Sequence, residues 1–90
     1  MTRLSIHITG AVQGVGYRYF VVRKARERNV TGWVKNRPNG TVDIEAVGER
    51  PQLEEFLRMV RIGPAAAHTA GVDARWYEDG PEYDDFDVQF

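Results

Sequence analysis

The sequence predicts an α+β fold, a ferredoxin-like βαββαβ sandwich in which two helices cover one face of an antiparallel sheet. Short stretches of alternating polar and apolar residues indicate strands, and two longer stretches with apolar residues at helical spacing indicate helices. These stretches follow one another in the order β-α-β-β-α-β, with one further short strand at the C-terminus. The length of 90 residues allows one hydrophobic core, so we expect a single domain over residues 1–90.

The first three predicted elements are a strand, a loop and a helix. Apolar residues alternate with polar ones over residues 3–9, which is typical of a half-buried strand. A loop that contains several glycines follows over residues 10–16, and a helix is predicted at residues 18–28. The apolar side of this helix is expected to consist of Tyr19, Phe20, Val21, Val22 and Ala25.

A hairpin is predicted next. Residues 30–36 and 41–47 have the composition of strands, and the turn Arg37-Pro38-Asn39-Gly40 lies between them. Asn-Gly is a strong hairpin signal because both residues readily adopt positive φ. The inward face of the second strand is expected to consist of Val42, Ile44 and Ala46.

The second half of the chain supplies one more helix and two more strands. Pro51 suits the first turn of a helix, where its missing N–H has no partner to lose. Apolar residues then follow at positions i, i+3, i+4 and i+7, namely Leu53, Phe56, Leu57 and Val60. After a predicted loop over residues 63–71, alternation indicates a strand at 72–76 and a last strand at 86–90.

The composition excludes several classes of protein. The chain has no cysteine, which excludes disulfides, zinc–thiolate sites and thiol catalysis and fits a reducing compartment. It has no apolar run of the roughly 18 residues that a membrane span needs, and no apolar block typical of a signal peptide. We therefore expect a cytoplasmic protein, and a monomer because no stretch of the sequence suggests an interface.

The charge is unevenly distributed although the net charge is only −1, a value that argues against nucleic acid as a partner. Residues 1–37 carry eight Lys or Arg and one acid, whereas residues 73–90 carry seven acids and one Arg. This asymmetry could draw an anionic ligand to the N-terminal half. A solvated charged surface would have the same composition, so both interpretations remain open.

The segment Gly10-Ala11-Val12-Gln13-Gly14-Val15-Gly16-Tyr17-Arg18 lies between a predicted strand and a predicted helix. Glycines allow backbone N–H groups to converge on one point, and a helix N-terminus adds partial positive charge, which together favour an anion. The Arg18 guanidinium can donate to two phosphate oxygens at once. The spacing matches neither a P-loop nor a dinucleotide-binding motif, and a tight turn beside a surface arginine would look the same.

Two motifs make the chain resemble the acylphosphatase family. Gly10-x-Val12-Gln13-Gly14-Val15-x-Tyr17-Arg18 resembles the first signature of that family. Gly32-Trp33-Val34-Lys35-Asn36-x-x-x-Gly40-x-Val42, with Gly48 six residues further on, resembles the second. The motifs occur in the right order and at the right separation, and the length and element order agree as well. The resemblance therefore covers essentially the whole chain.

This resemblance implies an enzyme that hydrolyses the carboxyl-phosphate bond of acyl phosphates to a carboxylate and inorganic phosphate. The phosphoryl group would be held by Arg18 and by the backbone amides of Gln13, Gly14, Val15, Gly16, Tyr17 and Arg18. Asn36 would orient the attacking water, and Thr41 is expected to support Asn36. Because the predicted fold makes the first and third strands neighbours, Arg18 and Asn36 should converge on one anion-sized pocket. Inorganic phosphate should act as product and competitive inhibitor.

Neither a metal nor another cofactor is expected. His7 lies on the polar face of a predicted strand and His68 lies in a predicted loop, so they form no ligand pair. The acidic residues Asp79, Glu82, Asp84 and Asp85 lack the spacing of a calcium-binding loop.

Other functions use the same features. The aromatic residues Trp33, Trp76 and Tyr77 could stack on RNA bases. The chain could also be a module that binds phosphate or carbamoyl phosphate without rapid turnover, a domain of a larger maturation enzyme, or a regulatory domain that binds an effector. The presence of both Arg18 and Asn36 favours a free-standing enzyme, which is the prediction we carry forward.

Overall fold

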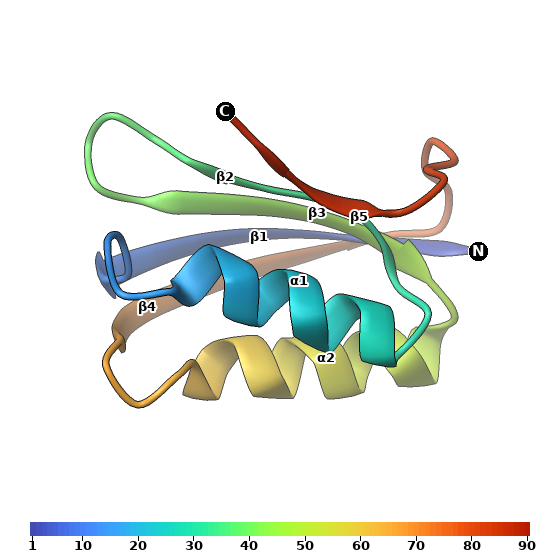
Figure 1. Cartoon of the computed structure of the whole chain (residues 1–90). Helices are drawn as coiled ribbons and strands as arrows, with labels where there is room; N and C mark the ends of the chain where they lie inside the picture. The colour runs from blue at the N-terminus through green and yellow to red at the C-terminus, as the bar shows by residue number, and fades with distance from the viewer.

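The fold is a five-stranded sheet with two helices packed against one face, seen in a computed structural model that describes all 90 residues (Figure 1). In chain order the elements are β1 (Thr2–Ala11), α1 (Tyr17–Glu27), β2 (Thr31–Asn36), β3 (Val42–Gly48), α2 (Arg50–Ile62), β4 (His68–Tyr77) and β5 (Phe86–Gln89). The predicted order of elements is confirmed. Neither helix has the length and hydrophobicity needed to span a bilayer, since the longer one, α2, has 13 residues.

The strands lie in the order β4-β1-β3-β2-β5, and the sheet is mixed rather than antiparallel. β1 is antiparallel to β3 and β4, and β3 is antiparallel to β2, but β5 runs parallel to β2. The expectation of an antiparallel sheet is therefore wrong for the last strand. β4 ends at the end of the sheet where β2 begins, because Tyr77 and Thr31 are both in register with the Arg3–Val47 pair. Residues 78–85 cross at this end, so β5 starts beside the start of β2 and runs in the same direction (Figure 1).

Two strands extend further than the sequence indicates. β4 begins at His68, inside the segment predicted as a loop over residues 63–71, and β1 continues to Ala11. The added residues pair with each other, Gly10 with Thr69 and Ala11 with His68, beyond a register shift after Thr9. Backbone pairing rather than a hydrophobic pattern holds this end of the two strands together, which is why alternation in the sequence did not reveal it.

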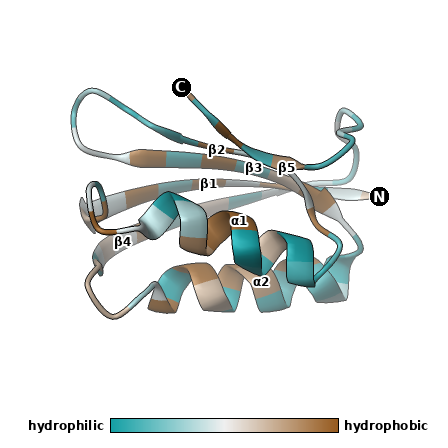
Figure 2. Cartoon of the chain, in the orientation of Figure 1, coloured by the Kyte–Doolittle hydropathy of each residue, from teal (hydrophilic) through white to brown (hydrophobic).

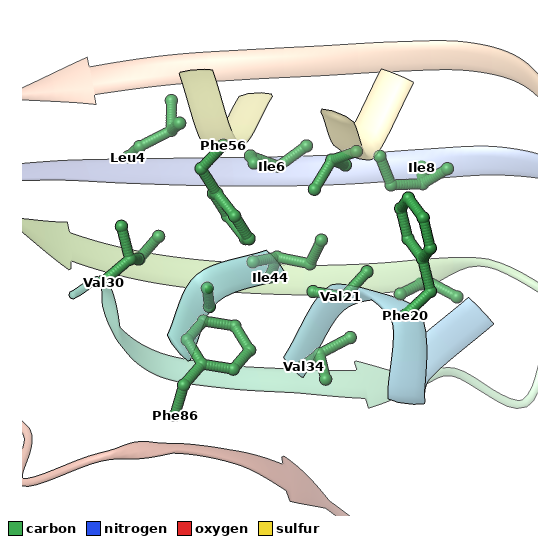
Figure 3. Close-up of a cluster of buried hydrophobic side chains, with 14 of the residues drawn as sticks. Leu4, Ile6, Ile8, Phe20, Val21, Val30, Val34, Ile44, Phe56 and Phe86 are labelled. Atoms are coloured by element: carbon green, nitrogen blue, oxygen red, sulfur yellow. The ribbon is translucent and has the colours of Figure 1, made fainter. Parts of the chain in front are cut away.

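The core lies between the helices and the inner face of the sheet. β1 contributes three buried side chains at alternate positions, and residues from β2, β3, both helices and β5 close around them (Figure 3). The labelled members of this cluster are Leu4, Ile6, Ile8, Phe20, Val21, Val30, Val34, Ile44, Phe56 and Phe86. Hydrophobic and hydrophilic positions alternate along both helices, as expected for elements buried on one side (Figure 2).

The buried side of α1 differs from the predicted one at its first turn. Tyr19 was expected to face the core, but its side chain is 72% exposed, whereas Tyr17 is only 1% exposed. The buried residues of α1 are Tyr17, Phe20, Val21 and Ala25, which share one face at helical spacing. Tyr19 lies off this face, so the prediction for Tyr19 is wrong and Tyr17 takes its place in the core.

Candidate active site

Residues 12–16, which we call the cradle loop, connect the end of β1 to the start of α1. Gly14 and Gly16 have φ values of +73° and +76°, a region that residues with a Cβ atom rarely adopt. Gly16 caps α1 without a side chain, and the first turn of α1 contains no acidic residue. The free N–H groups of this turn and the helix dipole therefore favour an anion at this point.

A pocket of about 160 Å³ opens above the cradle loop. Its lining residues are Val12, Gly14, Gly16, Tyr17, Arg18, Tyr19 and Asn36. Arg18 comes from the start of α1 and Asn36 from the end of β2, so the structure brings together the two side chains that were predicted to converge. Pockets for drug-sized ligands measure about 300–1,000 Å³, so this pocket suits a small group such as a phosphoryl group.

The Arg18 guanidinium is not paired with any carboxylate of the protein. Its Cζ atom lies 5.3 Å from the centroid of the Phe90 ring, a contact that occupies none of the N–H donors. An arginine with free donors at the edge of a small pocket can donate to two oxygens of one anion.

The Asn36 side chain carries an unpaired polar atom. Asn36 is the last residue of β2 and pairs with Val42 of β3, so its backbone is fixed by the sheet. Its Oδ1 is buried and has no hydrogen-bond partner in the protein. Buried polar atoms are nearly always hydrogen-bonded, and an exception requires an explanation, of which a catalytic role is one. The amide is thus not committed to holding the fold together.

The Gln13 side chain connects the cradle loop to the turn between β2 and β3. Its Nε2 donates to the backbone oxygens of Arg37 and Thr41, both at 2.8 Å. Sequence analysis assigned only the backbone amide of Gln13 to the site and missed this side chain. Nothing in one sequence indicates such a contact, because its partners lie 24 and 28 residues away.

Thr41 lies at the other end of the same turn. Its hydroxyl donates to Asn39 Oδ1 at 2.7 Å, its N–H donates to the same oxygen, and its carbonyl accepts from Gln13. These contacts fix the turn that follows Asn36 rather than the Asn36 amide itself. The predicted support of Asn36 by Thr41 stays a prediction, and the structure offers a route to it through the turn.

The outer face of the sheet carries a charged cluster behind the hairpin. Asp43 accepts from Arg37 Nε at 2.6 Å and lies 2.5 Å from His7 Nδ1. Partial burial opposes ionisation of Asp43, but the hydrogen bonds from His7 and Arg37 outweigh it and hold the pKa of Asp43 below its ordinary value. His7 of β1 and Arg37 of the turn therefore both contact Asp43 of β3, which ties the hairpin to β1 on the outer face of the sheet. No group of three or more His, Cys, Asp or Glu side chains is placed to hold a metal ion.

The aromatic residues considered for RNA stacking do not share one surface. Trp76 is partly buried against the core, on the side of the helices, and Arg50 covers its ring at 3.8 Å. Trp33 and Tyr77 are in register with Glu45 and Arg3, on the outer face. Arg3 stacks on the Tyr77 ring at 3.9 Å. These contacts give Trp76 and Tyr77 packing partners within the protein.

Tyr17 ties the start of α1 to α2. Its hydroxyl donates at 2.8 Å to the backbone oxygen of Val60, which lies in the last turn of α2 and has no partner within that helix. Burial raises the pKa of the Tyr17 hydroxyl well above its ordinary value. The residue that precedes Arg18 is thus tied to the second helix.

Replacing Tyr17 with Phe is expected to lower the free energy of unfolding by about 1–2 kcal/mol, because the Val60 carbonyl loses its donor. The folded wild type favours the neutral phenol, so its stability contribution is complete below pH ~10 and is lost as the pH rises above that value. Thermal melts of both proteins between pH 7 and 11 check this. The wild type should lose stability more steeply than Tyr17→Phe at the alkaline end, and parallel curves would contradict the role of Tyr17.

Comparison with known proteins agrees with the family resemblance of the two motifs and extends it along the chain. The chain matches the Acylphosphatase family over residues 4–88. It is 46% identical to an acylphosphatase of Archaeoglobus fulgidus over 90 residues, which is 100% of each chain. The crystal structure of acylphosphatase from Bacillus subtilis covers 100% of both chains with a TM-score of 0.97 and 33% identity.

A similar structure also occurs within a larger protein. The crystal structure of full-length HypF in its phosphate- and nucleotide-bound form matches 99% of this chain with a TM-score of 0.87 and 32% identity, but this match covers only 12% of that chain. The relative from Archaeoglobus fulgidus, by contrast, matches over its full length. The chain therefore belongs to the acylphosphatase family, the enzymes that hydrolyse acyl phosphates.

Proposed function

We propose that the pocket hydrolyses acyl phosphates by direct attack of water on the phosphorus atom, without a metal or a covalent intermediate. The observation that carries this proposal is that one small pocket is lined by the glycine-capped start of α1, by the unpaired Arg18 and by Asn36. The phosphoryl group binds to Arg18 and to the backbone amides of residues 13–18. Asn36 orients the water from the opposite side of the pocket.

The chemistry requires little more than these groups. An acyl phosphate leaves as a carboxylate, whose conjugate acid has a pKa of about 4, so the leaving group needs no proton donor. Phosphoryl transfer through a loose transition state depends mainly on positioning and on charge stabilisation. Arg18 and the amides stabilise the charge, and Asn36 positions the water.

Each polar group then has one task. The planar guanidinium of Arg18 donates to two phosphoryl oxygens, and the N–H groups of the cradle loop donate to the remaining charge as it develops. The Asn36 amide carries one acceptor and two donors, so it can bind both the water and a phosphoryl oxygen. The water loses its proton to the phosphate of the substrate. The pocket lining contains no carboxylate or histidine that could act as a base. Its titratable side chains are Arg18, the exposed Tyr19, and Tyr17, whose hydroxyl is bonded to Val60.

The matching experiment is an assay of the purified chain with benzoyl phosphate in the presence and absence of a chelator such as EDTA. We expect release of benzoate and inorganic phosphate at the same rate in both conditions, with competitive inhibition by inorganic phosphate. A simple alkyl phosphate should be hydrolysed far more slowly, because its leaving group has a conjugate acid of pKa about 16 and would need a proton donor. The monomeric state is a separate proposal, which size-exclusion chromatography checks.

Two outcomes would overturn parts of this proposal. Strong activation by added magnesium after chelation would show that a metal ion, rather than Arg18 and the amides, neutralises the phosphate charge. Binding of phosphate without turnover of benzoyl phosphate would show that the chain is a binding module, as the match to a segment of HypF also allows.

A further inference from the structure

We infer that the Gln13 side chain is a positioning residue, which sets the distance between the two halves of the pocket. The inference rests on the proposed function, since it concerns how Asn36 is placed for attack. One half of the pocket, the cradle loop with Arg18, binds the phosphoryl group. The other half is Asn36, which directly precedes the hairpin turn. Gln13 belongs to the first half, and its two hydrogen bonds end on the turn next to the second.

No other side-chain hydrogen bond joins the cradle loop to the turn. The sheet holds the strands below the pocket, since Ile8 and Asn36 are both in register with Val42. Above this row β1 leaves β3, and the turn at residues 37–41 continues beyond the paired strands. The two hydrogen bonds from Gln13 Nε2, each 2.8 Å long, are therefore the connection that spans the pocket above the sheet.

The two carbonyls that Gln13 contacts already have partners in the turn. The Thr41 oxygen accepts from the Arg37 N–H at 2.8 Å, and the Arg37 oxygen accepts from the Gly40 N–H at 3.1 Å. The turn is thus closed by its own backbone, and removing Gln13 leaves no buried carbonyl without a donor. A contact that the turn does not need for its own closure, but that fixes the turn relative to the cradle loop, fits a positioning role better than a structural one.

The size of the effect follows from the sensitivity of attack to geometry. Misplacing a reacting group by about 1 Å can cost about a hundredfold in rate. Without Gln13, the cradle loop still binds phosphate through Arg18 and its own amides, but no side chain then holds the loop, and the phosphorus atom bound to it, at a set distance from the turn that follows Asn36. The loss should therefore appear in kcat and not in the affinity for phosphate.

The test is a double-mutant cycle with Gln13→Met and Asn36→Ala, assayed with benzoyl phosphate and with inorganic phosphate as inhibitor. Methionine keeps the length of the side chain and removes both donors. We expect Gln13→Met to lower kcat by about 10- to 100-fold, with the inhibition constant of phosphate changed by less than about threefold. In the Asn36→Ala background the same substitution should lower kcat by less than about twofold, because there is no longer an amide to position.

A matched control and a second variant keep the result specific. Thr31→Val removes a side-chain hydrogen bond to the Val47 carbonyl at the far end of the same strand pair, and it should leave kcat unchanged. If Gln13→Met fails to fold, Gln13→Glu replaces it. Its carboxylate cannot donate at neutral pH, so kcat should fall, and activity relative to wild type should recover as the carboxyl becomes protonated at acid pH.

The outcomes separate this inference from the proposed function. Equal, additive losses from Gln13→Met in both backgrounds, or a loss of phosphate affinity as large as the loss of kcat, would overturn the positioning role and leave the proposed function intact. An inactive wild type, or an Asn36→Ala protein with wild-type kcat, would overturn both.

Discussion

Replacing Arg18 with Ala is expected to lower kcat/KM for benzoyl phosphate by about a thousandfold or more, which is the scale of losing an arginine that stabilises a phosphoryl transition state. The Arg18 guanidinium is the one unpaired cation that lines the pocket, so no second side chain can take over its charge. Because part of its contact already exists in the ground state, KM and the inhibition constant of phosphate should rise as well.

Two further variants make this result interpretable. Arg18→Lys should recover only part of the activity, because an ammonium group cannot reproduce the planar pair of donors. Arg23→Ala removes a positive charge from the same helix without contact with the pocket, and its activity should stay close to that of the wild type. If Arg18→Ala bound phosphate as well as the wild type does, Arg18 would be an ordinary surface residue and the site would be misassigned.

Replacing Asn36 with Ala is expected to reduce kcat by at least about a hundredfold, typical of losing one well-placed polar group, while KM changes little. In the proposed mechanism the Asn36 amide contributes to the reaction rather than to binding, because the cradle loop and Arg18 would hold the phosphoryl group. Stability should change little, since Asn36 Oδ1 has no partner within the protein to lose. Steady-state kinetics and a thermal melt of the variant measure the two quantities.

Two controls accompany the Asn36 measurement. Asn36→Asp should be no more active than Asn36→Ala, because it places a negative charge beside an anionic substrate. Lys35→Ala changes the adjacent residue, which is in register with Asp43 on the outer face of the sheet, and it should leave kcat unchanged. A folded Asn36→Ala protein with near wild-type kcat would mean that another group positions the water.

Local sequence patterns predicted most of the fold, for physical reasons that the structure makes plain. Leu4, Ile6 and Ile8 alternate because one face of β1 is buried and the other is not. Asn39 and Gly40 marked the turn correctly, with Gly40 at a φ of +92°. The patterns were less informative at the ends of elements, where β1 and β4 pair through their backbones, and at Tyr19, which lies beside the buried face of α1 rather than on it.

The features that could not be predicted depend on contacts between distant residues. The parallel direction of β5 follows from where β4 ends in the folded sheet, which no pattern within residues 78–90 reveals. The motifs pointed to Arg18 and Asn36, and the structure places both in one pocket. The Gln13 side chain was missed because its role depends on two backbone carbonyls of the hairpin, and any polar residue in a loop would look the same in the sequence.

The central claim is that water attacks the phosphorus atom of the acyl phosphate, and hydrolysis in water enriched in oxygen-18 tests it most directly. The purified chain is allowed to hydrolyse benzoyl phosphate in the enriched water, and mass spectrometry of both products locates the label. Attack on a phosphoryl group held by Arg18 and the cradle loop predicts one labelled oxygen in inorganic phosphate and none in benzoate. Label in benzoate would show that water attacks the carbonyl carbon instead, and the assignment of Arg18 and Asn36 to attack at phosphorus would be wrong.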